Sequence, residues 1–492
     1  MRGRLTSLGL GACLLLPWLQ PLSARADDSR DPEVAYAQCS GGKQAPLDAQ
    51  ILACSRILNT GGESREIAVW ALNQRANARV KKGDGDGAMS DFGIALQLMP
   101  KSFETFVNRG LAFSAKGDHD RAISDYDNAI EIKRDSYQAY FDRAISFERA
   151  GNQDRAIADY GETIRLNPKF TGAYVNRGHL LARRGDGDLA IADYTAAIRV
   201  DPDLGVAYLN RGIAYMTKKE LDQAIADFDK VIALKPDDPA GYRDRGVVWL
   251  AKGDKDRALA DLDHALEIKP DFEPALGSRG DVWMQKKEWG KAIADYDQAI
   301  RLKPDSPAGL ASLYFARGAS WVGNGDLDRG IADLDEALRL RPDYALALEA
   351  RGSAFQRKGQ LDKALADLDQ SIRLKPDSGY ALNIRCFARG LLNRDLDAAL
   401  ADCDHAIGLL PGHPAILDSR AFVRFRRAEY PQAIADTDAA LAIDPKYADA
   451  MFVKGLAEKA LGRTSAASAD LAAARAANPT IGDVYARSGV NP

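Results

Sequence analysis

Two alternating runs of apolar residues at helical spacing recur through most of the chain. Residues 206–215 carry apolar or small side chains three and four positions apart, and residues 221–234 repeat the pattern. Such spacing places the apolar side chains on one face of a helix. Pro236 ends the second run, and a Lys-Gly-Asp turn often separates the two runs, as at residues 116–118. Glycine ends helices and aspartate caps them, so the pattern predicts an all-α chain of short helix pairs.

Proline marks a period of 34 residues. The prolines that follow the second runs are Pro100, Pro168, Pro202, Pro236, Pro270, Pro304, Pro342, Pro376, Pro411, Pro445 and Pro479, with Arg134 in one proline slot. This period predicts twelve repeats over residues 69–479. Four extra residues at 305–310 and one at 386–395 interrupt it. We expect insertions tolerated in loops, and the alternative is a bend or hinge.

Large, small and aromatic residues occupy fixed positions within each repeat. In the fourth repeat these residues are Tyr174, Gly178, Leu181, Ala190, Tyr194, Ala197 and Pro202. Small residues at the slots of Gly178 and Ala190 let two antiparallel helices approach closely. These positions resemble the tetratricopeptide repeat pattern over more than four-fifths of the chain. The resemblance implies an all-α solenoid, a right-handed superhelix of about twelve helix-turn-helix repeats.

The N-terminus has the features of a secretory signal. Arg2 and Arg4 precede an apolar stretch over residues 8–22, and Ala24-Arg25-Ala26 fits a small-x-small cleavage site. We predict a signal peptide at residues 1–26. The alternatives are an uncleaved anchor and a lipoprotein site at Cys13. Residues 27–68 are predicted as a polar segment, disordered over 27–36, and a degenerate N-terminal cap half-repeat. Residues 480–492 are predicted as a C-terminal cap segment.

Export changes how the cysteines are interpreted. Without Cys13, the chain keeps Cys39, Cys54, Cys386 and Cys403, an even number for an oxidising compartment. Of the three possible pairings, proximity in sequence favours Cys39–Cys54 and Cys386–Cys403. Cys386 and Cys403 also occupy the small and aromatic slots of one repeat, which face each other. The alternative is buried, inert thiols. The surrounding pattern resembles that of exported bacterial tetratricopeptide proteins.

Opposite charges recur at two further slots. Arginine stands before the first-helix small residue, where the family usually has leucine, and aspartate stands before the second-helix aromatic. We expect a ladder of structural ion pairs, and the alternative is a charged binding stripe. The pairs in the middle of the chain are Arg177 with Asp193, Arg211 with Asp227, and Arg245 with Asp261.

Composition and motifs argue against catalysis and against nucleic-acid binding. The 66 Lys+Arg and 70 Asp+Glu give a net charge of −4, so the chain has no overall basic character. It has no Gly-rich phosphate loop, His-Glu-x-x-His, Cys-x-x-Cys or Gly-x-Ser-x-Gly motif. Residues 84–87 match part of a calcium loop but are better explained as a solvated turn. We therefore expect no enzyme activity, cofactor or metal. After residue 30 no apolar run has the roughly 18 residues of a membrane helix.

Family resemblance implies that the first helix of each repeat lines a concave binding surface. Its candidate residues are Leu209, Ile213, Met216, Val247, Leu250 and Met284 in the middle, and Phe387, Phe422, Phe425 and Phe452 near the end. Exposed apolar side chains in a groove favour an extended peptide or a partner helix. The alternative is that these side chains are buried between neighbouring helices.

The sequence thus predicts a non-catalytic scaffold or adaptor of the bacterial cell envelope that binds a protein or peptide. We expect an exported, periplasmic chain, with secretion as the alternative. Two other functions remain open: a structural subunit of a secretion or surface-polymer assembly, and an accessory factor of a carbohydrate- or peptidoglycan-active enzyme. The partner is not identified by the residues.

Overall fold

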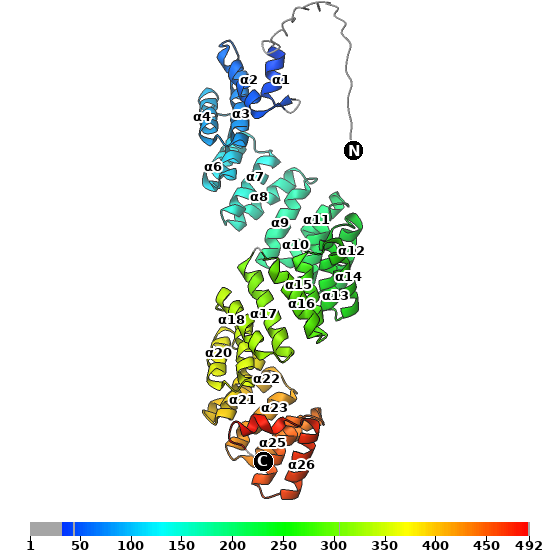
Figure 1. The fold of residues 1–492 in the computed structure, drawn as a ribbon. Helices are drawn as coiled ribbons and strands as arrows, with labels where there is room; N and C mark the ends of the chain where they lie inside the picture. Colours follow the sequence, from blue (N-terminus) through cyan, green and yellow to red (C-terminus); the bar gives the residue numbers. More distant parts are fainter. Residues whose placement is uncertain (1–31, 43–44, 305, 491–492) are drawn as a thin grey trace, which may run out of the picture. The chain divides into compact units, whose positions relative to one another are not determined.

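The computed structural model describes residues 32–42, 45–304 and 306–490, which form helices and no strand (Figure 1). The predicted signal peptide, residues 1–26, lies outside the described residues. The chain divides into two compact units, and the division falls after Ala207, within helix α11 (Gly205–Thr217).

Within residues 32–42 and 45–207, the first compact unit contains ten complete helices. Their bounds are α1 (Pro32–Cys39), α2 (Leu47–Asn59), α3 (Arg65–Lys82), α4 (Gly85–Leu98), α5 (Phe103–Ala115), α6 (His119–Ile132), α7 (Tyr137–Arg149), α8 (Gln153–Leu166), α9 (Thr171–Arg184) and α10 (Gly187–Val200).

The second compact unit contains most of α11 and all later helices. Their bounds are α12 (Leu221–Leu234), α13 (Pro239–Ala251), α14 (Lys255–Ile268), α15 (Glu273–Gln285), α16 (Trp289–Arg301), α17 (Pro307–Gly323), α18 (Leu327–Leu340), α19 (Ala345–Arg357), α20 (Leu361–Leu374), α21 (Gly379–Leu392), α22 (Leu396–Leu409), α23 (Pro414–Arg426), α24 (Tyr430–Ile443), α25 (Ala448–Ala460), α26 (Thr464–Ala477) and α27 (Ile481–Ala486).

Helices α3 to α26 form twelve consecutive pairs, each with an odd-numbered first helix and an even-numbered second helix. We number these pairs repeats 1 to 12. An additional pair, α1 and α2, precedes them, and the short helix α27 follows them. Two expectations need correction. Residues 32–36, predicted as disordered, belong to α1. The four-residue insertion near 305–310 is not a loop, because α17 has 17 residues where α15 has 13, about one extra helical turn.

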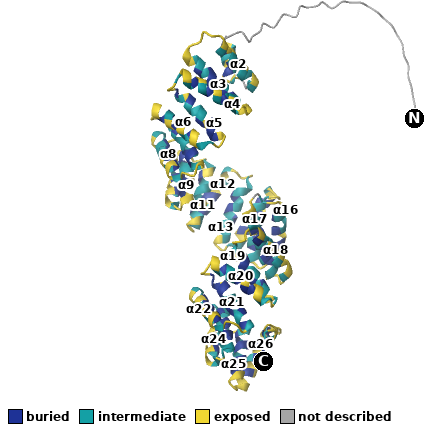
Figure 2. Ribbon diagram, turned by 90° about the vertical axis from the view of Figure 1, so that its left-hand side faces the viewer, coloured by how far each residue is buried: buried dark blue, intermediate teal, exposed yellow. Residues whose placement is uncertain are grey.

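Close contact between a small and a large residue holds each pair together. A Cβ atom added to Gly178 would lie 2.7 Å from the ring of Tyr194, and one added to Gly280 would lie 2.6 Å from Tyr296. Both tyrosine rings are buried, and alanines such as Ala190 are buried beside them. Buried residues lie along the helices and exposed residues gather at their ends and turns (Figure 2). A side chain at Gly178 or Gly280 would have to displace the facing tyrosine ring, so these slots hold small residues.

The turns inside the repeats follow the expected chemistry. Gly117 has a φ of 82°, which ends the first helix, and the Asp118 carboxylate accepts a hydrogen bond from the backbone N–H of Arg121 at 3.2 Å. This arrangement stops one helix and caps the next. In other repeats a residue with a side chain adopts the left-handed conformation at this turn, namely Lys219, Lys287 and Ala428.

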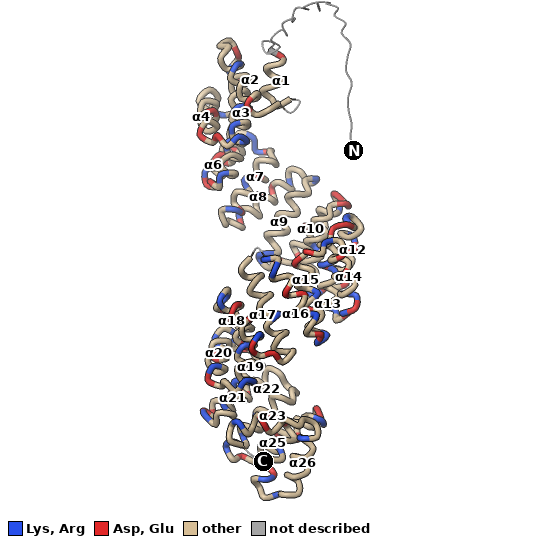
Figure 3. Tube along the Cα trace, in the orientation of Figure 1, with Lys and Arg blue, Asp and Glu red and all other residues tan. Residues whose placement is uncertain are grey.

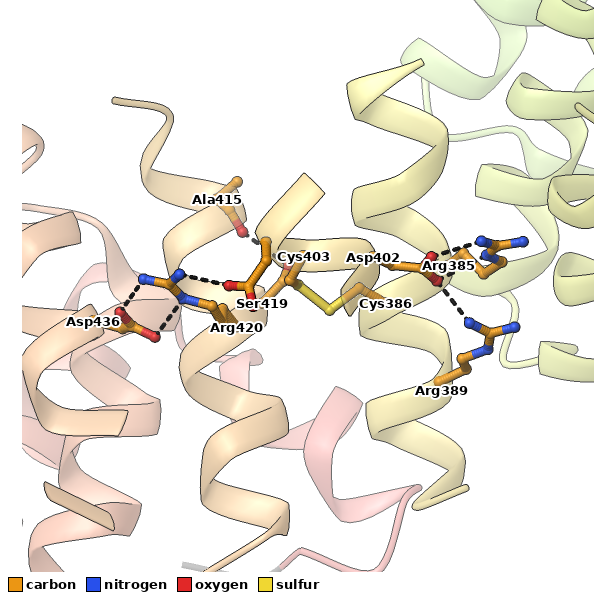
Figure 4. The surroundings of a disulfide bond; sticks show 10 residues. Arg385, Cys386, Arg389, Asp402, Cys403, Ala415, Ser419, Arg420 and Asp436 are labelled. Atoms are coloured by element: carbon orange, nitrogen blue, oxygen red, sulfur yellow. Dashed lines mark hydrogen bonds and ion pairs between the residues drawn. A yellow bond between two sulfur atoms is a disulfide. The ribbon is translucent and has the colours of Figure 1, made fainter. Parts of the chain in front are cut away.

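Two disulfides staple helix pairs. Cys39 of α1 bonds Cys54 of α2, and Cys386 of α21 bonds Cys403 of α22 (the latter in Figure 4), the pairing that the sequence favours. All four cysteines are buried. In repeat 10 the bond stands where other repeats pack a small residue against a larger one, such as Gly178 against Tyr194. The first disulfide crosslinks α1 to α2, and α2 packs on α3 of repeat 1. Among the described helices, none combines the length and apolar character needed to cross a bilayer.

Candidate functional site

A bidentate arginine–aspartate pair joins the two helices of nearly every repeat. Arg177 donates to Asp193 through Nε at 2.8 Å and through Nη2 at 2.7 Å. The Arg211–Asp227 pair has the same two bonds, and so has the Arg245–Asp261 pair. The other bidentate pairs are Arg75–Asp91, Arg109–Asp125, Arg143–Asp159, Arg279–Asp295, Arg317–Asp333, Arg351–Asp367, Arg385–Asp402 and Arg420–Asp436.

The third guanidinium nitrogen donates a hydrogen bond to a carboxylate of the preceding repeat. Nη1 of Arg279 donates to Asp263 at 2.7 Å, and Asp263 belongs to the second helix of repeat 6. The carboxylate that accepts this bond stands two residues after the aspartate of that repeat's own pair. The same link is made by Arg143–Asp127, Arg245–Asp229, Arg317–Asp297, Arg351–Asp335, Arg385–Asp369 and Arg420–Asp404. In repeat 12 a lysine replaces the arginine, and the Lys454 ammonium lies 2.8 Å from the Asp438 carboxylate. Arg75 instead donates to the hydroxyl of Ser55 in the N-terminal pair, at 2.9 Å.

Sequence reasoning missed these second carboxylates. The signal was visible as an Asp-x-Asp spacing, as at Asp261 and Asp263. One arginine therefore connects three helices, its own first helix and the second helices of two successive repeats. Figure 3 shows Lys/Arg and Asp/Glu positions distributed over the helices rather than collected in one block.

The ladder pairs are largely buried. In the bidentate pairs the aspartate side chains are 1–11% exposed and the arginine side chains 16–26% exposed. Hydrogen bonds from the guanidinium to the carboxylates raise the pKa of Arg245 and of Arg279 above the usual value. For Asp159, burial raises the carboxyl pKa more than its bonds to Arg143 lower it. The arginine and aspartate charges of the ladder are paired with each other. This pairing favours structural ion pairs over a charged binding stripe.

The six predicted binding residues of the middle repeats lie on three first helices of the second compact unit. We call the surface that they form the first-helix face. Ile213 is 41% exposed, whereas the other five, Leu209, Met216, Val247, Leu250 and Met284, are half-buried. Leu209 and Met216 pack against a cluster that contains Phe228 and Val248, and Leu250 and Met284 pack against the next cluster. The first-helix face is therefore partly buried by packing between helices and partly exposed to solvent.

The predicted aromatic residues near the C-terminus are arranged differently. Phe422 and Phe452 are completely buried, and the expectation that they are exposed to a partner is not met. Phe387 and Phe425 are half-buried and pack against the same cluster. The physical reason is that α27 covers this surface: the ring of Tyr485 lies 5.0 Å from that of Phe422, centre to centre.

Several carboxyl groups outside the ladder are buried without a cation. On α7, the Asp142 side chain is buried and receives a long hydrogen bond from Gln138 Nε2 at 3.3 Å. Burial raises the pKa of Asp142 to about 6. Within the described residues no group of three or more His, Cys, Asp or Glu side chains is arranged to hold a metal ion. These acids stand singly or in pairs, and we assign them no catalytic role.

Replacing a ladder arginine should destabilise the protein strongly. In Arg279→Met, the buried Asp295 carboxylate loses both of its hydrogen bonds from Arg279. Leaving a buried charge unpaired costs roughly 3–5 kcal/mol, and partial exposure reduces this to about 2–4 kcal/mol. Urea unfolding followed by circular dichroism measures the change. As a control, Arg165→Met removes an exposed pair with Glu162 and should cost less than about 1 kcal/mol. Equal effects of the two substitutions would contradict the ladder.

Asp142→Asn should stabilise the protein at neutral pH. The folded-state pKa of about 6 exceeds the ordinary 3.8, so the buried carboxyl favours its neutral form. Above pH 6 the ionised group costs about 1–3 kcal/mol, and this cost disappears progressively as the pH falls from 6 to 4. The gain in urea-unfolding free energy should therefore be present at pH 7.5 and small at pH 4.5. The exposed Asp135→Asn serves as control, and a gain independent of pH would refute the explanation.

Comparisons with known proteins agree with the repeat pattern. Two family models, both described as tetratricopeptide repeat, match this chain. One matches residues 211–282, and the other matches residues 107–169, 141–205, 175–239 and 315–379. No curated protein matches the sequence.

Three solved structures are similar to parts of the chain. A tetratricopeptide repeat protein from Parabacteroides merdae ATCC 43184 is 18% identical over 51% of this chain and 98% of its own, with a TM-score of 0.44. The APC/C hetero-tetramer Cut9-Hcn1 matches at 15% identity, 87% and 98% coverage, and a TM-score of 0.49. YrrB, described as a TPR protein with an unusual peptide-binding site, matches at 22% identity, 39% and 97% coverage, and a TM-score of 0.31. The family matches and the repeated helix pairs together show that the chain belongs to the tetratricopeptide repeat family.

Proposed function

We propose that this chain is a non-catalytic protein-interaction scaffold of the bacterial cell envelope, which binds a partner segment on the first-helix face. The tetratricopeptide fold itself suggests a protein–protein interaction scaffold. The observation that carries the more specific proposal is the row of incompletely buried apolar side chains on α11, α13 and α15, with Ile213 the most exposed at 41%.

The physical basis is a rigid surface with a few apolar anchors. Helices α11, α13 and α15 are each fixed by a ladder arginine, Arg211, Arg245 and Arg279. Their first-helix residues are therefore held in position before a partner arrives. A preorganised surface loses little conformational entropy on binding, so modest apolar contacts can give measurable affinity.

Two features support an exported location. Residues 1–26 have the pattern of a signal peptide, and the chain contains two buried disulfides, which persist in oxidising compartments. The periplasm is the compartment that we propose.

A capture experiment tests the first-helix face. Mature protein, residues 27–492, serves as bait on envelope extract, and retained proteins are identified by mass spectrometry. Ile213→Asp places a charge among the apolar anchors and should reduce capture of the specific partner at least tenfold. Leu374→Asp makes the same change at an exposed position (46%) on the second helix α20 and should leave capture unchanged. Capture that Ile213→Asp leaves intact, with both variants folded, would refute binding at this face.

A further inference from the structure

The end of the chain lies across the first helices of the last three repeats. We call residues Ile481–Val490 the C-terminal segment; it contains α27 and the turn after it (Figure 1). The ring centre of Tyr485 lies 6.2 Å from that of Phe387 on α21, 5.0 Å from Phe422 on α23 and 4.9 Å from Phe452 on α25. Ile481, Tyr485 and Val490 are all buried in this contact. A cap for repeat 12 alone would contact α25 and α26, whereas this segment reaches back two repeats.

An arginine on α23 holds the backbone of the C-terminal segment. Nη2 of Arg426 donates to the backbone carbonyl of Ser488 at 2.7 Å, and more weakly to that of Leu391 on α21 at 3.4 Å. Its guanidinium also lies over the Phe422 ring, 5.3 Å from the ring centre. Aromatic contacts and a donor to the main chain are how a groove recognises a bound peptide. We call this surface, lined by Phe387, Phe422, Phe452 and Arg426, the C-terminal groove.

A cavity of about 560 Å³ lies beside the C-terminal segment, toward repeats 9 and 10. Leu361, Leu391 and Leu392 line one side of this cavity, and Val484 and Ser488 of the segment line the other. This space has the size of a ligand pocket and adjoins the C-terminal groove rather than lying inside it.

Tyr485 is buried beside two carboxyl groups, and the hydrogen bonding among these polar groups is incomplete. The carboxyl group of Asp418 is completely buried, and its Oδ1 has no hydrogen-bond partner. The Tyr485 phenol interacts with the nearby Asp449 carboxyl, but no well-formed hydrogen bond joins its hydroxyl to any group. Burial raises the pKa values of both carboxyl groups. Burying polar groups without full pairing costs free energy, which weakens the attachment of the segment.

We propose that the C-terminal segment occupies the C-terminal groove reversibly. A short helical segment of a partner protein, with the same anchoring residues as the C-terminal segment, displaces it and binds in the groove. These anchoring residues are a tyrosine and an aliphatic residue four positions before it, as in Ile481 and Tyr485. The inference rests on the proposed scaffold function but concerns a second surface. A partner has to displace the segment, so its apparent affinity is reduced by the fraction of chains in which the groove is closed.

A peptide taken from the chain itself provides the probe. A fluorescein-labelled synthetic peptide of residues 480–490 is titrated against full-length mature protein, and fluorescence anisotropy is measured. Tyr485→Ala in the protein removes the internal anchor and should strengthen peptide binding at least tenfold over wild type. Val484→Ala, a change at a 41% exposed position of the same helix, should match wild type. A peptide that itself carries Tyr485→Ala should not bind. Equal binding to wild type and to the Tyr485→Ala protein, or binding to neither, would overturn the proposal.

A measurement on the wild-type protein avoids dependence on a variant that misfolds. Hydrogen exchange is followed with and without an excess of isotopically heavy peptide 480–490, so that the added peptide is distinguished by mass. The chain's own residues 481–490 should lose protection while α21, α23 and α25 keep theirs, and unchanged protection would count against displacement. A concentration-dependent dimer of the wild type that Tyr485→Ala abolishes would assign the groove to a second copy and overturn the proposal. If the peptide shows no binding or displacement while Ile213→Asp still abolishes capture, the C-terminal groove proposal is wrong and binding at the first-helix face is retained.

Discussion

In repeats 3 and 6 to 11, a single guanidinium group of the first helix bonds carboxylates on two second helices. Arg279 shows the arrangement: two of its nitrogens hold Asp295 of its own repeat, and the third holds Asp263 of the repeat before it. A repeat of two short helices cannot bury enough apolar surface alone and depends on its neighbours. Because the carboxylates are nearly buried, the pairing tolerates little displacement, and it fixes both the angle within a pair and the contact between pairs. The apolar surfaces proposed for binding are carried on the helices that these arginines position.

Much of this architecture could be predicted from the sequence because the period makes the same pattern visible many times. The glycine–aromatic slots, exemplified by Gly178 and Tyr194, and the paired cysteines of repeat 10 follow from their offsets, since facing slots of one helix pair have a fixed separation. The primary arginine–aspartate pairs follow for the same reason. The link from Arg279 to Asp263 was not predicted, although the Asp-x-Asp spacing was visible, because it depends on how one repeat packs on the next.

The candidate binding surfaces were harder to predict. On the first-helix face, the pattern identified apolar positions but not how far neighbouring helices cover them, and only Ile213 proved to be well exposed. Near the C-terminus, Phe422 and Phe452 matched the same slots and yet are buried, because Tyr485 lies on them. Residues after 479 have no periodic counterpart from which their position could be inferred. Tertiary placement of a non-repeating segment decided the outcome there.

Hydrogen exchange measured by mass spectrometry can show whether one arginine couples two successive repeats. Arg351 of α19 bonds Asp367 on α20 and Asp335 on α18. In Arg351→Met, amide exchange should become faster in both α18 and α20, since one substitution releases both second helices. Faster exchange confined to α19 and α20, with α18 as protected as in the wild type, would contradict the coupling.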